Sequence, residues 1–501
     1  MFLFLKQWLY AAGLAYSALK QRGLAVQPTV PAPIDITLTG HLSTADAKSY
    51  VYENFDVPDG VTGIYVAQTY SRSDSGNRLD MGIWDQTGHE LALDGDFTTG
   101  FRGWSGHSRS EFTVSPESAT PGYIPGPIEP GSWSIGMEAH SIVDEGLDYE
   151  LHIRLTFDPV TSDFEPAYAP SRVGEAAPTE DDGQTPIIEP PIHWYRGDLH
   201  THSIYSDAIQ TPQDIVAAAR AANLSFFFST EHNTQSLNLV WGTMAPDDML
   251  VGRGIEVTTM SGHWNALGLT PDQWVEFRYT ESKDLLPAVD HLQRSGGFAG
   301  MNHPYITGCY LCNWVFSDES FAHMDSVEVW NGPWADLNEN ALTLWQNLLV
   351  NGSTITAVGG SDSHDAVRRV GEPTTVVGAP ELSTAAILDG MRASRVYLLR
   401  YADVDLEFTV QDGGDLLAHV GDTVDRQSTT DTLSAVVRTS GVPDDARAIL
   451  ISDTGAFHEQ NETATAGDMK VDIDTAAKFV RLEVRDGNNA MLGMTNPIWF
   501  E

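Results

Sequence analysis

The sequence predicts a multi-domain protein in which a central α/β region lies between two regions built only of β-strands. Three observations support this architecture. A chain of 501 residues is too long for a single core and is expected to form two to four domains. Apolar runs alternate with helix-like stretches from residue 193 to about 400, whereas short strand-like runs separated by turn residues occur on both sides. The alternation predicts βα units, most simply a barrel, and the flanks predict β-sandwiches.

Residues 1–30 form a leader of uncertain role. Lys6 and Lys20 interrupt its apolar run, so it contains no stretch long enough for a transmembrane helix. A signal peptide carries its positive charge before the apolar core, whereas Lys6 follows the first five apolar residues. We therefore expect a soluble protein, with a cytoplasmic location slightly favoured over export, and export remains open.

The N-terminal β-sandwich is expected over residues 31–160, and a second sandwich over residues 401–501. Trp104, Tyr123 and Trp133 of the first sandwich are either core residues or contacts to a glycan, and core packing is the simpler interpretation. Residues 161–192 are rich in Pro, Glu, Asp, Ala and Thr, which predicts an extended and poorly packed linker. The α/β region then spans residues 193–400.

Charge and cysteine content exclude several classes of protein. The chain has 69 acidic and 28 basic residues, a formal net charge of −41, so binding of nucleic acid through a basic patch is not expected. Cys309 and Cys312 are the only cysteines and provide no disulfide framework. Their spacing supplies two of the four ligands of a structural zinc site, so a local thiol pair or disulfide is favoured.

The most informative stretch is Gly-Asp-Leu-His-Thr-His-Ser-Ile-Tyr-Ser-Asp, residues 197–207. On a strand, residues i and i+2 face the same side, so His200 and His202 can point at one spot beyond the strand. Imidazole is the commonest metal ligand, and Asp207 adds a carboxylate oxygen. A lone pair of histidines also arises by chance on half-buried strands, so the interpretation depends on further ligands elsewhere.

Further histidines and carboxylates follow apolar strands, where a (β/α) barrel collects its active site. Nine residues share this position: His200, His202, Asp207, His232, Glu256, His263, His303, Asp362 and His364. His193, His291 and His323 do not, and they are interpreted as ordinary polar residues. Six strand-end histidines with three carboxylates are difficult to explain by packing, because unpaired buried polar groups are costly.

This pattern resembles the PHP (polymerase and histidinol phosphatase) superfamily, and within it the CehA/McbA type of metallohydrolases. The resemblance covers about 200 residues and is carried by His200-Thr201-His202 with Asp207, Glu231-His232-Asn233, Gly254-Ile255-Glu256, His263, His303-Pro304 and Asp362-Ser363-His364. It implies that the central region is a distorted (β/α)7 barrel that binds two or three divalent metal ions.

The resemblance also implies how the ligands divide among the ions. The expected sets are His200, His202, Glu256 and Asp362 for one ion, Glu256 as a bridge with His263 and His303 for the second, and Asp207, His232 and His364 for the third. Glu231 stands where many relatives carry Asp and is expected to lie beside the ligands rather than among them. The ligand types suit Zn, Mn or Fe without selecting one.

The expected function is metal-dependent hydrolysis of a small-molecule phosphoester, because paired metals can hold both the attacking and the leaving oxygen. Hydrolysis of a carbamate or carboxylic ester at the same centre is the alternative. A non-catalytic protein that binds a glycan or a surface, with a vestigial barrel, is disfavoured by the intact ligand set. The nucleophile is expected to be a water bridging the metals at Glu256, and no separate catalytic residue is assigned.

Four residues near strand ends are candidate substrate contacts, although each also suits a structural role: Tyr305, Arg253, Trp330 and Asn331. Arg253, Arg368 and Arg369 could hold a phosphate through guanidinium hydrogen bonds, or form surface ion pairs instead. The sequence does not predict an oligomeric state.

Overall fold

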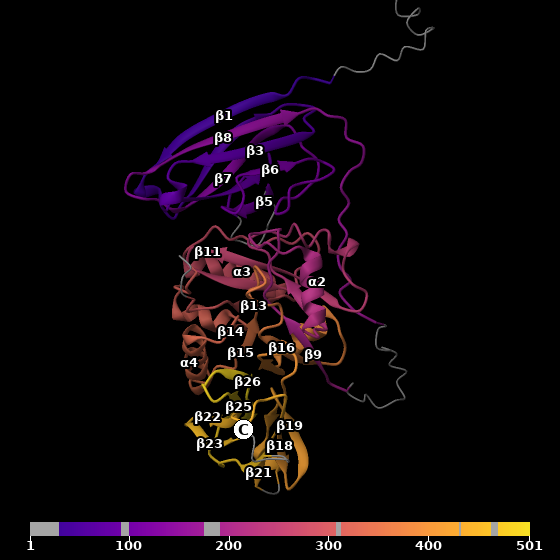
Figure 1. Ribbon diagram of the computed structural model, residues 1–501, viewed down its shortest axis with the longest axis vertical. Coiled ribbons are helices and arrows are strands. Elements are labelled where there is room, and N and C mark those ends of the chain that lie inside the picture. The colour runs from indigo at the N-terminus through magenta and orange to yellow at the C-terminus, as the bar shows by residue number, and fades with distance from the viewer. Residues whose placement is uncertain (1–29, 92–99, 175–190, 307–311, 430–431, 462–468) are drawn as a thin grey trace, which may run out of the picture.

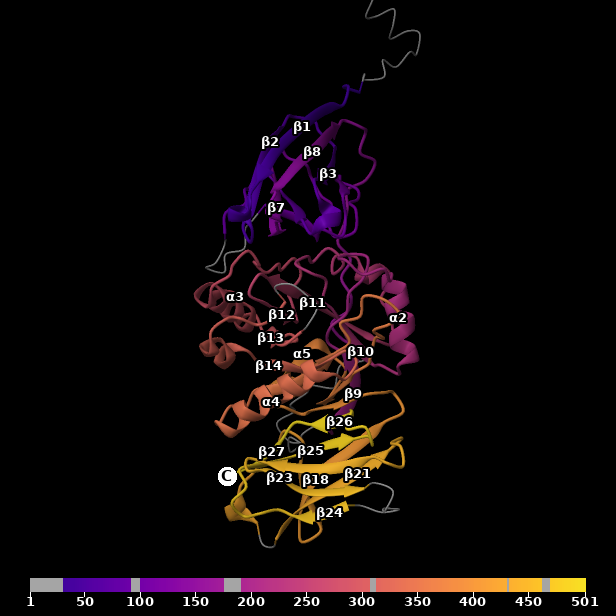
Figure 2. The ribbon, with the colours of Figure 1, turned by 60° about the vertical axis from the view of Figure 1, so that its left-hand side comes forward.

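The computed structural model describes residues 30–91, 100–174, 191–306, 312–429, 432–461 and 469–501. Three regions are stacked along the long axis: an N-terminal β-region, a central α/β region and a C-terminal β-region (Figure 1). The same order is visible from the side (Figure 2). The predicted class, mixed α/β with many strands and few helices, is confirmed. Residues 1–29 of the leader expected over residues 1–30 lie outside the described residues, and no helix among those described is long and apolar enough to cross a membrane.

The N-terminal region contains two four-stranded antiparallel sheets. The first sheet holds, in order, β1 (Ile34–Leu42), β8 (Leu147–Thr156), β3 (Gly63–Tyr70) and β6 (Glu111–Val114). The second holds β2 (Tyr50–Val57), β7 (Gly131–Ser141), β4 (Arg78–Trp84) and β5 (Phe101–Gly106). Side chains along β8 alternate between buried and more exposed, as expected for a strand with one face on a core. Trp104, Tyr123 and Trp133 are all buried, which favours the core interpretation over a glycan-binding face.

The central region contributes nine strands to the largest sheet. Along the chain they are β9 (His193–Asp198), β10 (Phe226–Ser229), β11 (Leu250–Thr259), β12 (Gly262–Leu267), β13 (Phe298–Met301), β14 (Ser326–Asn331), β15 (Thr356–Gly360), β16 (Thr374–Ala379) and β17 (Val396–Leu399). Their order in the sheet is β15-β14-β13-β12-β11-β10-β9-β16-β17. β15, at one end of this series, approaches β16, the strand next to the other end: the Gly359 N–H donates to the Thr375 hydroxyl at 3.0 Å, and this hydroxyl donates to the Gly359 carbonyl at 2.7 Å.

The sheet is mixed rather than parallel. β9, β10 and β11 pair in parallel, as do β13, β14 and β15, but β12 is antiparallel to both of its neighbours. β16 is also antiparallel to β9 and to β17. The strict βα repeat predicted from the sequence is therefore broken where β11 turns directly into β12 through Met260 and Ser261, without a helix between them.

Four helices accompany these strands: α2 (Pro212–Ala221), α3 (Ser282–Arg294), α4 (Asp336–Val350) and α5 (Thr384–Arg392). The helix start predicted at Thr211 is confirmed, because the Thr211 side chain accepts from the Asp214 N–H and Pro212 occupies the first turn. α3 and α4 each bury an apolar face, which includes Leu285 and Trp345. Their burial fixes the strands that carry the candidate ligands.

The C-terminal region continues the central sheet. β26 (Met491–Thr495) pairs with β17, and the sheet extends through β25 (Phe479–Arg485), β22 (Arg447–Ser452) and β23 (Gly455–Asn461). β27 (Ile498–Phe500) and β20 (Thr423–Val424) attach beside this path. A separate sheet holds β19 (Asp415–His419), β18 (Asp405–Asp412), β21 (Leu433–Ser440) and β24 (Met469–Asp472). Backbone hydrogen bonds therefore cross the boundary expected at residue 400.

The described part of the predicted linker is partly packed. Ala167 donates to the carbonyl of Leu239 and accepts from the N–H of Gly242, and Ala169 is buried. Val173 donates to the carbonyl of Leu382. The loose linker predicted from composition thus follows the surface of the central region up to residue 174, and residues 175–190 lie outside the described part of the chain.

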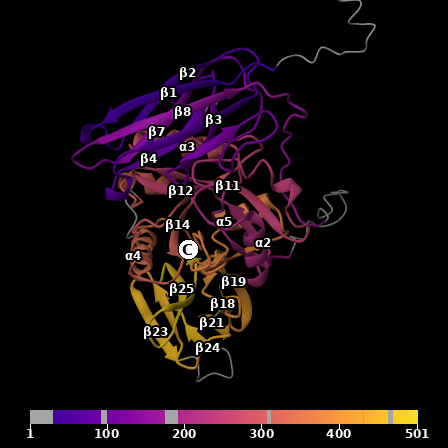
Figure 3. The same cartoon turned by 45° about the horizontal axis from the view of Figure 1, so that its top comes forward.

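The N-terminal region is fixed on the central region by aromatic and charged contacts. Phe101 stacks on Trp274 with ring centroids 4.4 Å apart, and Trp104 meets Phe277 edge-on at 5.0 Å. Arg278, paired with Glu276, donates to the Tyr52 hydroxyl at 2.6 Å. In a tilted view the N-terminal strands lie across the central strands (Figure 3). This docking brings the N-terminal region over the ends of the strands from which the candidate ligands project.

Candidate metal centre

The nine candidate ligands lie on strands of the central region or in the segments that follow them. His200, His202 and Asp207 follow β9, His232 follows β10, His303 follows β13, and Asp362 and His364 follow β15. Glu256 and His263 lie within β11 and β12 rather than after a strand, because these strands continue as an antiparallel hairpin. Isolated bridges join Thr201 to Ser363 and His232 to Glu256, and they align the segments.

The Glu256 carboxylate lies at the middle of the cluster. It is completely buried, and one nitrogen of each of five imidazoles lies within ion-pair distance of its oxygens. The distances are 3.3 Å to His200 Nε2, 3.3 Å to His202 Nε2, 2.9 Å to His232 Nδ1, 3.2 Å to His263 Nδ1 and 3.2 Å to His303 Nε2.

All nine side chains fall into groups whose ligand atoms lie within 4.8 Å of one another. The groups are His202, Asp207, His232 and His364; His200, His202 and Asp362; His200, Glu256 and His303; and His232, Glu256 and His263. One predicted set therefore occurs within a single group, which contains Asp207, His232 and His364 and also His202. Glu256 approaches His263 and His303 in two separate groups. The residues implied by the resemblance are therefore neighbours in space.

The donor atoms suit bound cations. His200 Nε2, both ring nitrogens of His202, Glu256 Oε2 and His303 Nδ1 are buried and have no hydrogen-bond partner. His200 Nε2 and Glu256 Oε1 are 3.3 Å apart, but their geometry does not make a hydrogen bond. Buried polar atoms are normally satisfied, and unsatisfied ones are costly. Imidazole and carboxylate donors directed at one region are the ligand set of Zn, Mn or Fe.

The backbone around the cluster is held in uncommon conformations. Asp362, Asn233 and His303 have φ angles of 50°, 59° and 22°, which non-glycine residues rarely adopt. Gly360 ends β15 two residues before Asp362 and allows close approach, since a Cβ there would lie 2.4 Å from His200 Cβ. Such conformations concentrate at functional sites, where the surrounding structure compensates for their cost.

The electrostatics of the cluster separate its histidines into two kinds. Burial lowers the pKa of His202 to about 3 and that of His263 to about 4, so both are neutral at pH 7. Burial alone would lower the pKa of His364, but its hydrogen bond to Asp207 and the Asp207 charge raise it to about 10. Burial opposes charge on His200, but the charges of Glu256 and Glu328 outweigh it and raise its pKa. The pKa of His232 is likewise raised despite burial, by the charges of Asp207 and Glu256. Burial would raise the pKa of Glu256, yet the surrounding imidazoles hold it well below its usual range.

Two buried carboxylates that were not among the predicted site residues hold the ligands in place. Glu328 Oε1 lies 3.0 Å from His200 Nδ1, and its Oε2 accepts from the His303 N–H at 2.9 Å. Asp198 accepts from the N–H groups of His200, Ser361 and Gly371 at 3.1, 3.0 and 2.8 Å. Asp198 and Glu328 are both carboxylates within otherwise apolar strands, and this pattern was the signal in the sequence that could have marked them as residues that support the ligands.

Glu231, predicted to lie beside the ligands, accepts from the hydroxyls of Ser203 and Ser206 at 2.6 and 2.5 Å. It is buried and belongs to none of the metal-binding groups among the described residues. Its hydrogen bonds fix the loop between His202 and Asp207. Its part in the centre stays a prediction.

Replacing Glu328 with glutamine is expected to weaken metal binding by about 10–100-fold, the usual cost of losing a partner that orients a metal ligand. The amide nitrogen of glutamine would face either the His200 ring or the His303 N–H, where the carboxylate now accepts. Competition with a chelator measures the affinity. Glu483→Gln is the matched control, since Glu483 is equally buried but bonds Arg481 and Arg485. Unchanged affinity in Glu328→Gln would contradict the role given to this carboxylate.

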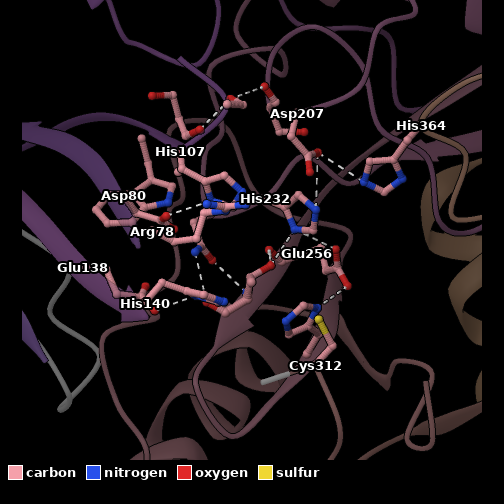
Figure 4. Close-up of a pocket in the computed structure, with 18 of the residues that line it drawn as sticks. Arg78, Asp80, His107, Glu138, His140, Asp207, His232, Glu256, Cys312 and His364 are labelled. Atoms are coloured by element: carbon pink, nitrogen blue, oxygen red, sulfur yellow. Dashed lines mark hydrogen bonds and ion pairs between the residues drawn. The ribbon is translucent and has the colours of Figure 1, made fainter. Parts of the chain in front are cut away.

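A cavity of about 890 Å³ opens at the cluster and continues to the N-terminal region. Seven of the nine candidate ligands line it: Asp207, His232, Glu256, His263, His303, Asp362 and His364. The remainder of its wall includes side chains of the N-terminal region, among them Arg78, His107 and His140 (Figure 4). Its volume is in the range of small-molecule binding sites.

The four candidate substrate contacts do not line this cavity. Trp330 is 1% exposed and packs in the core, with its Nε1–H donating to the carbonyl of Gly332, so the structure gives it a packing role instead. Arg253 donates to the Leu269 carbonyl and lies over the Tyr168 ring, which explains its position away from the site. Tyr305 is exposed and is not among the lining residues, and Asn331 is buried, with its Nδ2 donating to Glu328 Oε2 at 3.0 Å.

Of the arginines considered for phosphate, Arg368 alone lines the cavity. Its Nη1 donates to Asp362 Oδ2 and Asn331 Oδ1, both at 2.7 Å, so it neutralises part of the charge on a candidate ligand. Arg369 pairs with Glu372 instead. Cys312 also lines the cavity and is disulfide-bonded, while Cys309 lies outside the described residues.

No protein-family model and no curated protein match this chain. Among solved structures, a two-domain protein of Bacteroides vulgatus, named as containing a predicted PHP-like metal-dependent phosphoesterase, is 18% identical, with 65% of this chain and 99% of that chain covered and a TM-score of 0.37. A protein of Bifidobacterium adolescentis named as a metal-dependent phosphoesterase is 16% identical, with coverages of 39% and 96% and a TM-score of 0.28.

An amidohydrolase of Chromobacterium violaceum, with bound sulfate and no metal, is 15% identical, with coverages of 40% and 96% and a TM-score of 0.27. All three TM-scores are below 0.5 and all three identities below 25%, so these likenesses carry no argument about the function of this chain. The functional conclusion depends on the residues of the cluster.

Proposed function

We propose that this protein is a metal-dependent hydrolase of the PHP type, in its CehA/McbA branch, and that it cleaves small-molecule phosphoesters. One observation carries the proposal. A fully buried carboxylate, Glu256, is surrounded by five imidazoles at 2.9–3.3 Å, while His200 Nε2 and His202 Nε2 have no hydrogen-bond partner. Divalent cations placed among these atoms would satisfy all of them.

The proposed ligand sets are those of the resemblance, with two or three ions of Zn, Mn or Fe. Glu256 would bridge two of the ions, and His202 would stand between the sets because it belongs to two of the spatial groups. Within this proposal the central region is a distorted (β/α)7 barrel, and the flanking β-regions are sandwiches. The paired approach of Thr375 and Gly359 supports closure of the barrel.

Divalent ions, when bound, would supply Lewis acidity at the scissile bond and acidify a water at neutral pH. The residues of the chain would provide the rest. Glu256 and Asp362 carry negative charge in a buried site of a protein whose net charge is −41. This negative charge would attract cations and would offset part of their positive charge in the pocket. His364 lines the cavity with its Nε2 3.2 Å from Asp207 Oδ1, so in its neutral form it would hold an ion together with Asp207 and His232.

Phosphoester hydrolysis is favoured over the alternative by Arg368, which lines the cavity beside Asp362. The N–H groups of a guanidinium match the oxygens of a phosphate. A carbamate or carboxylic ester would need only a polarised carbonyl, for which a guanidinium is not required. The same centre would nevertheless hydrolyse such esters, and this remains the second candidate.

A four-substrate panel separates the two candidates. The metal-loaded protein is assayed with para-nitrophenyl phosphate, bis(para-nitrophenyl) phosphate, para-nitrophenyl acetate and 1-naphthyl methylcarbamate, with a chelated sample as the control. We expect turnover of at least one phosphate ester, lost on chelation and restored by added metal. Turnover of the acetate and carbamate alone would reject the phosphoesterase proposal in favour of the second candidate. No turnover of any substrate would reject both.

A further inference from the structure

The cavity has a second group of histidines and carboxylates, opposite the metal centre. It consists of Asp80 on β4, His107 directly after β5, and Glu138 and His140 on β7. Figure 4 shows these side chains on one side of the cavity, with Asp207, His232, Glu256 and His364 on the other. The two sides belong to regions more than sixty residues apart in the sequence and come together only through docking of the N-terminal region. No step of the proposed hydrolysis uses this second group.

The carboxylates of this group stand behind the imidazoles. Asp80 Oδ1 is 2.9 Å from His107 Nδ1, and Glu138 Oε1 is 3.5 Å from His140 Nδ1. The side chains of Asp80 and Glu138 are only 12% and 8% exposed, whereas those of His107 and His140 are 49% and 24% exposed. The Tyr50 hydroxyl also donates to Glu138, at 3.0 Å. All four residues line the cavity, and the two imidazoles are more exposed there than the two carboxylates.

These contacts favour the protonated form of both imidazoles. The hydrogen bond to Asp80 raises the pKa of His107. Burial opposes charge on His140, but the hydrogen bond to Glu138 and the charge of Asp80 outweigh it, so its pKa is also raised. Arg78 lines the cavity beside them, with its Nη1 fixed by the carbonyls of Ser73 and Asn77 at 2.7 Å each. We call Arg78, His107 and His140 the donor wall.

A metal ion is the competing occupant, because ligand atoms of Asp80, Glu138 and His140 lie within 4.8 Å of one another. Two observations favour an anion instead. None of these three residues has a buried orphaned atom, in contrast with the metal centre. Arg78 is close enough that its charge lowers the pKa of both His107 and His140, and the same charge would repel a dication.

We propose that the donor wall binds a second anionic group of the substrate, a carboxylate or a phosphate, at the end away from the bond that is hydrolysed. This inference rests on the proposed function, because it takes the metal centre as the place of reaction. Met260, Ile306 and Val367 line the same cavity and provide apolar contacts for the body of such a molecule. The substrate would then be small and anionic at both ends, and the N-terminal region would determine its selection.

Binding of phosphonates to the metal-loaded protein tests the proposal without requiring turnover. Calorimetry compares phenylphosphonate, 4-carboxyphenylphosphonate and 1,4-phenylenediphosphonate. We expect at least one of the doubly anionic compounds to bind the wild type about tenfold more tightly than phenylphosphonate, the size of a charge-assisted hydrogen bond. Whichever of the two binds more tightly identifies the distal group as carboxylate or phosphate.

The double variant His107→Gln/His140→Gln is expected to lose this preference while its affinity for phenylphosphonate stays within about twofold. The single variants, each expected to lose about threefold of the preference, repeat the test if the double variant does not fold. His41→Gln is the matched control, because His41 pairs with Asp148 at 2.7 Å in the same region but does not line the cavity. It is expected to keep the full preference.

Three results would overturn the proposal: no preference in the wild type, an equal loss of affinity for all three compounds in the variants, or loss of one metal equivalent in His140→Gln, which would make the group a metal site. A retained preference for doubly anionic compounds in a protein that hydrolyses no phosphoester would support the donor wall and reject only the proposed function.

Discussion

Replacing Glu256 with glutamine is expected to abolish hydrolysis and to remove at least one bound metal ion. The carboxylate lies within 3.3 Å of five imidazoles and is the only acidic group common to two of the spatial groups of candidate ligands. Glutamine keeps the shape but cannot bridge two cations with negative oxygens. We expect kcat/KM to fall well beyond the roughly 10–100-fold cost of losing a residue that only orients a metal ligand. Elemental analysis and steady-state kinetics measure the two effects.

Glu231→Gln is the matched control for this experiment. Glu231 is also a buried glutamate in the same part of the molecule, but it bonds Ser203 and Ser206 and belongs to no metal-binding group among the described residues. Its variant should keep the metal content, with a rate reduced less than about tenfold. Full metal content and wild-type kinetics in Glu256→Gln would show that the centre is organised differently.

Part of the candidate site could be proposed from the sequence because the spacing of two ligand pairs is local. His200 and His202 are separated by one residue, and Asp362 and His364 by one residue, so each pair is recognisable without knowledge of the fold. The supporting residues are different in kind. Glu328 lies in the middle of a buried strand, and its contact with His200 joins positions 128 residues apart. No local pattern marks such a contact.

The donor wall was beyond prediction for the same reason. Arg78, His107 and His140 are dispersed over three segments of a β-region that shows no ligand-like spacing. They approach the cavity only because aromatic side chains such as Phe101 and Trp104 dock the N-terminal region on the central one. From its sequence that region is expected to be a separate sandwich, and the substrate contacts expected beside the metals all belong to the central region.

The sequence predicted the fold class more accurately than it predicted the directions of the strands. Alternation of apolar runs and helical stretches indicated α/β structure correctly, but it does not distinguish a crossover helix from a hairpin. β11 and β12 are joined through Met260 and Ser261, and this hairpin places Glu256 and His263 on antiparallel neighbours. Continuation of the sheet from β17 into β26 likewise depends on pairing residues almost one hundred positions apart.

Metal loading is expected to release protons at neutral pH, and loading should therefore become tighter as the pH rises. His200, His232 and His364 have raised pKa values in the metal-free protein, that of His364 to about 10, and each must lose a proton before it can bind an ion. His202 and His263, with pKa values of about 3 and 4, are already neutral and release none. The His364 proton alone should improve affinity about tenfold per pH unit between pH 6 and 8.

Calorimetric titration with Mn²⁺ at pH 6, 7 and 8, in two buffers of different ionisation enthalpy, counts the protons released. His364→Asn should release fewer protons and show a shallower pH dependence, since it retains neither the imidazole nor its proton. His41→Gln, which alters an imidazole–carboxylate pair far from the centre, should match the wild type. A proton count of zero at pH 7, with affinity independent of pH, would mean that Glu256 and Asp207 do not hold their imidazole partners charged, and the electrostatic account of the centre would fail.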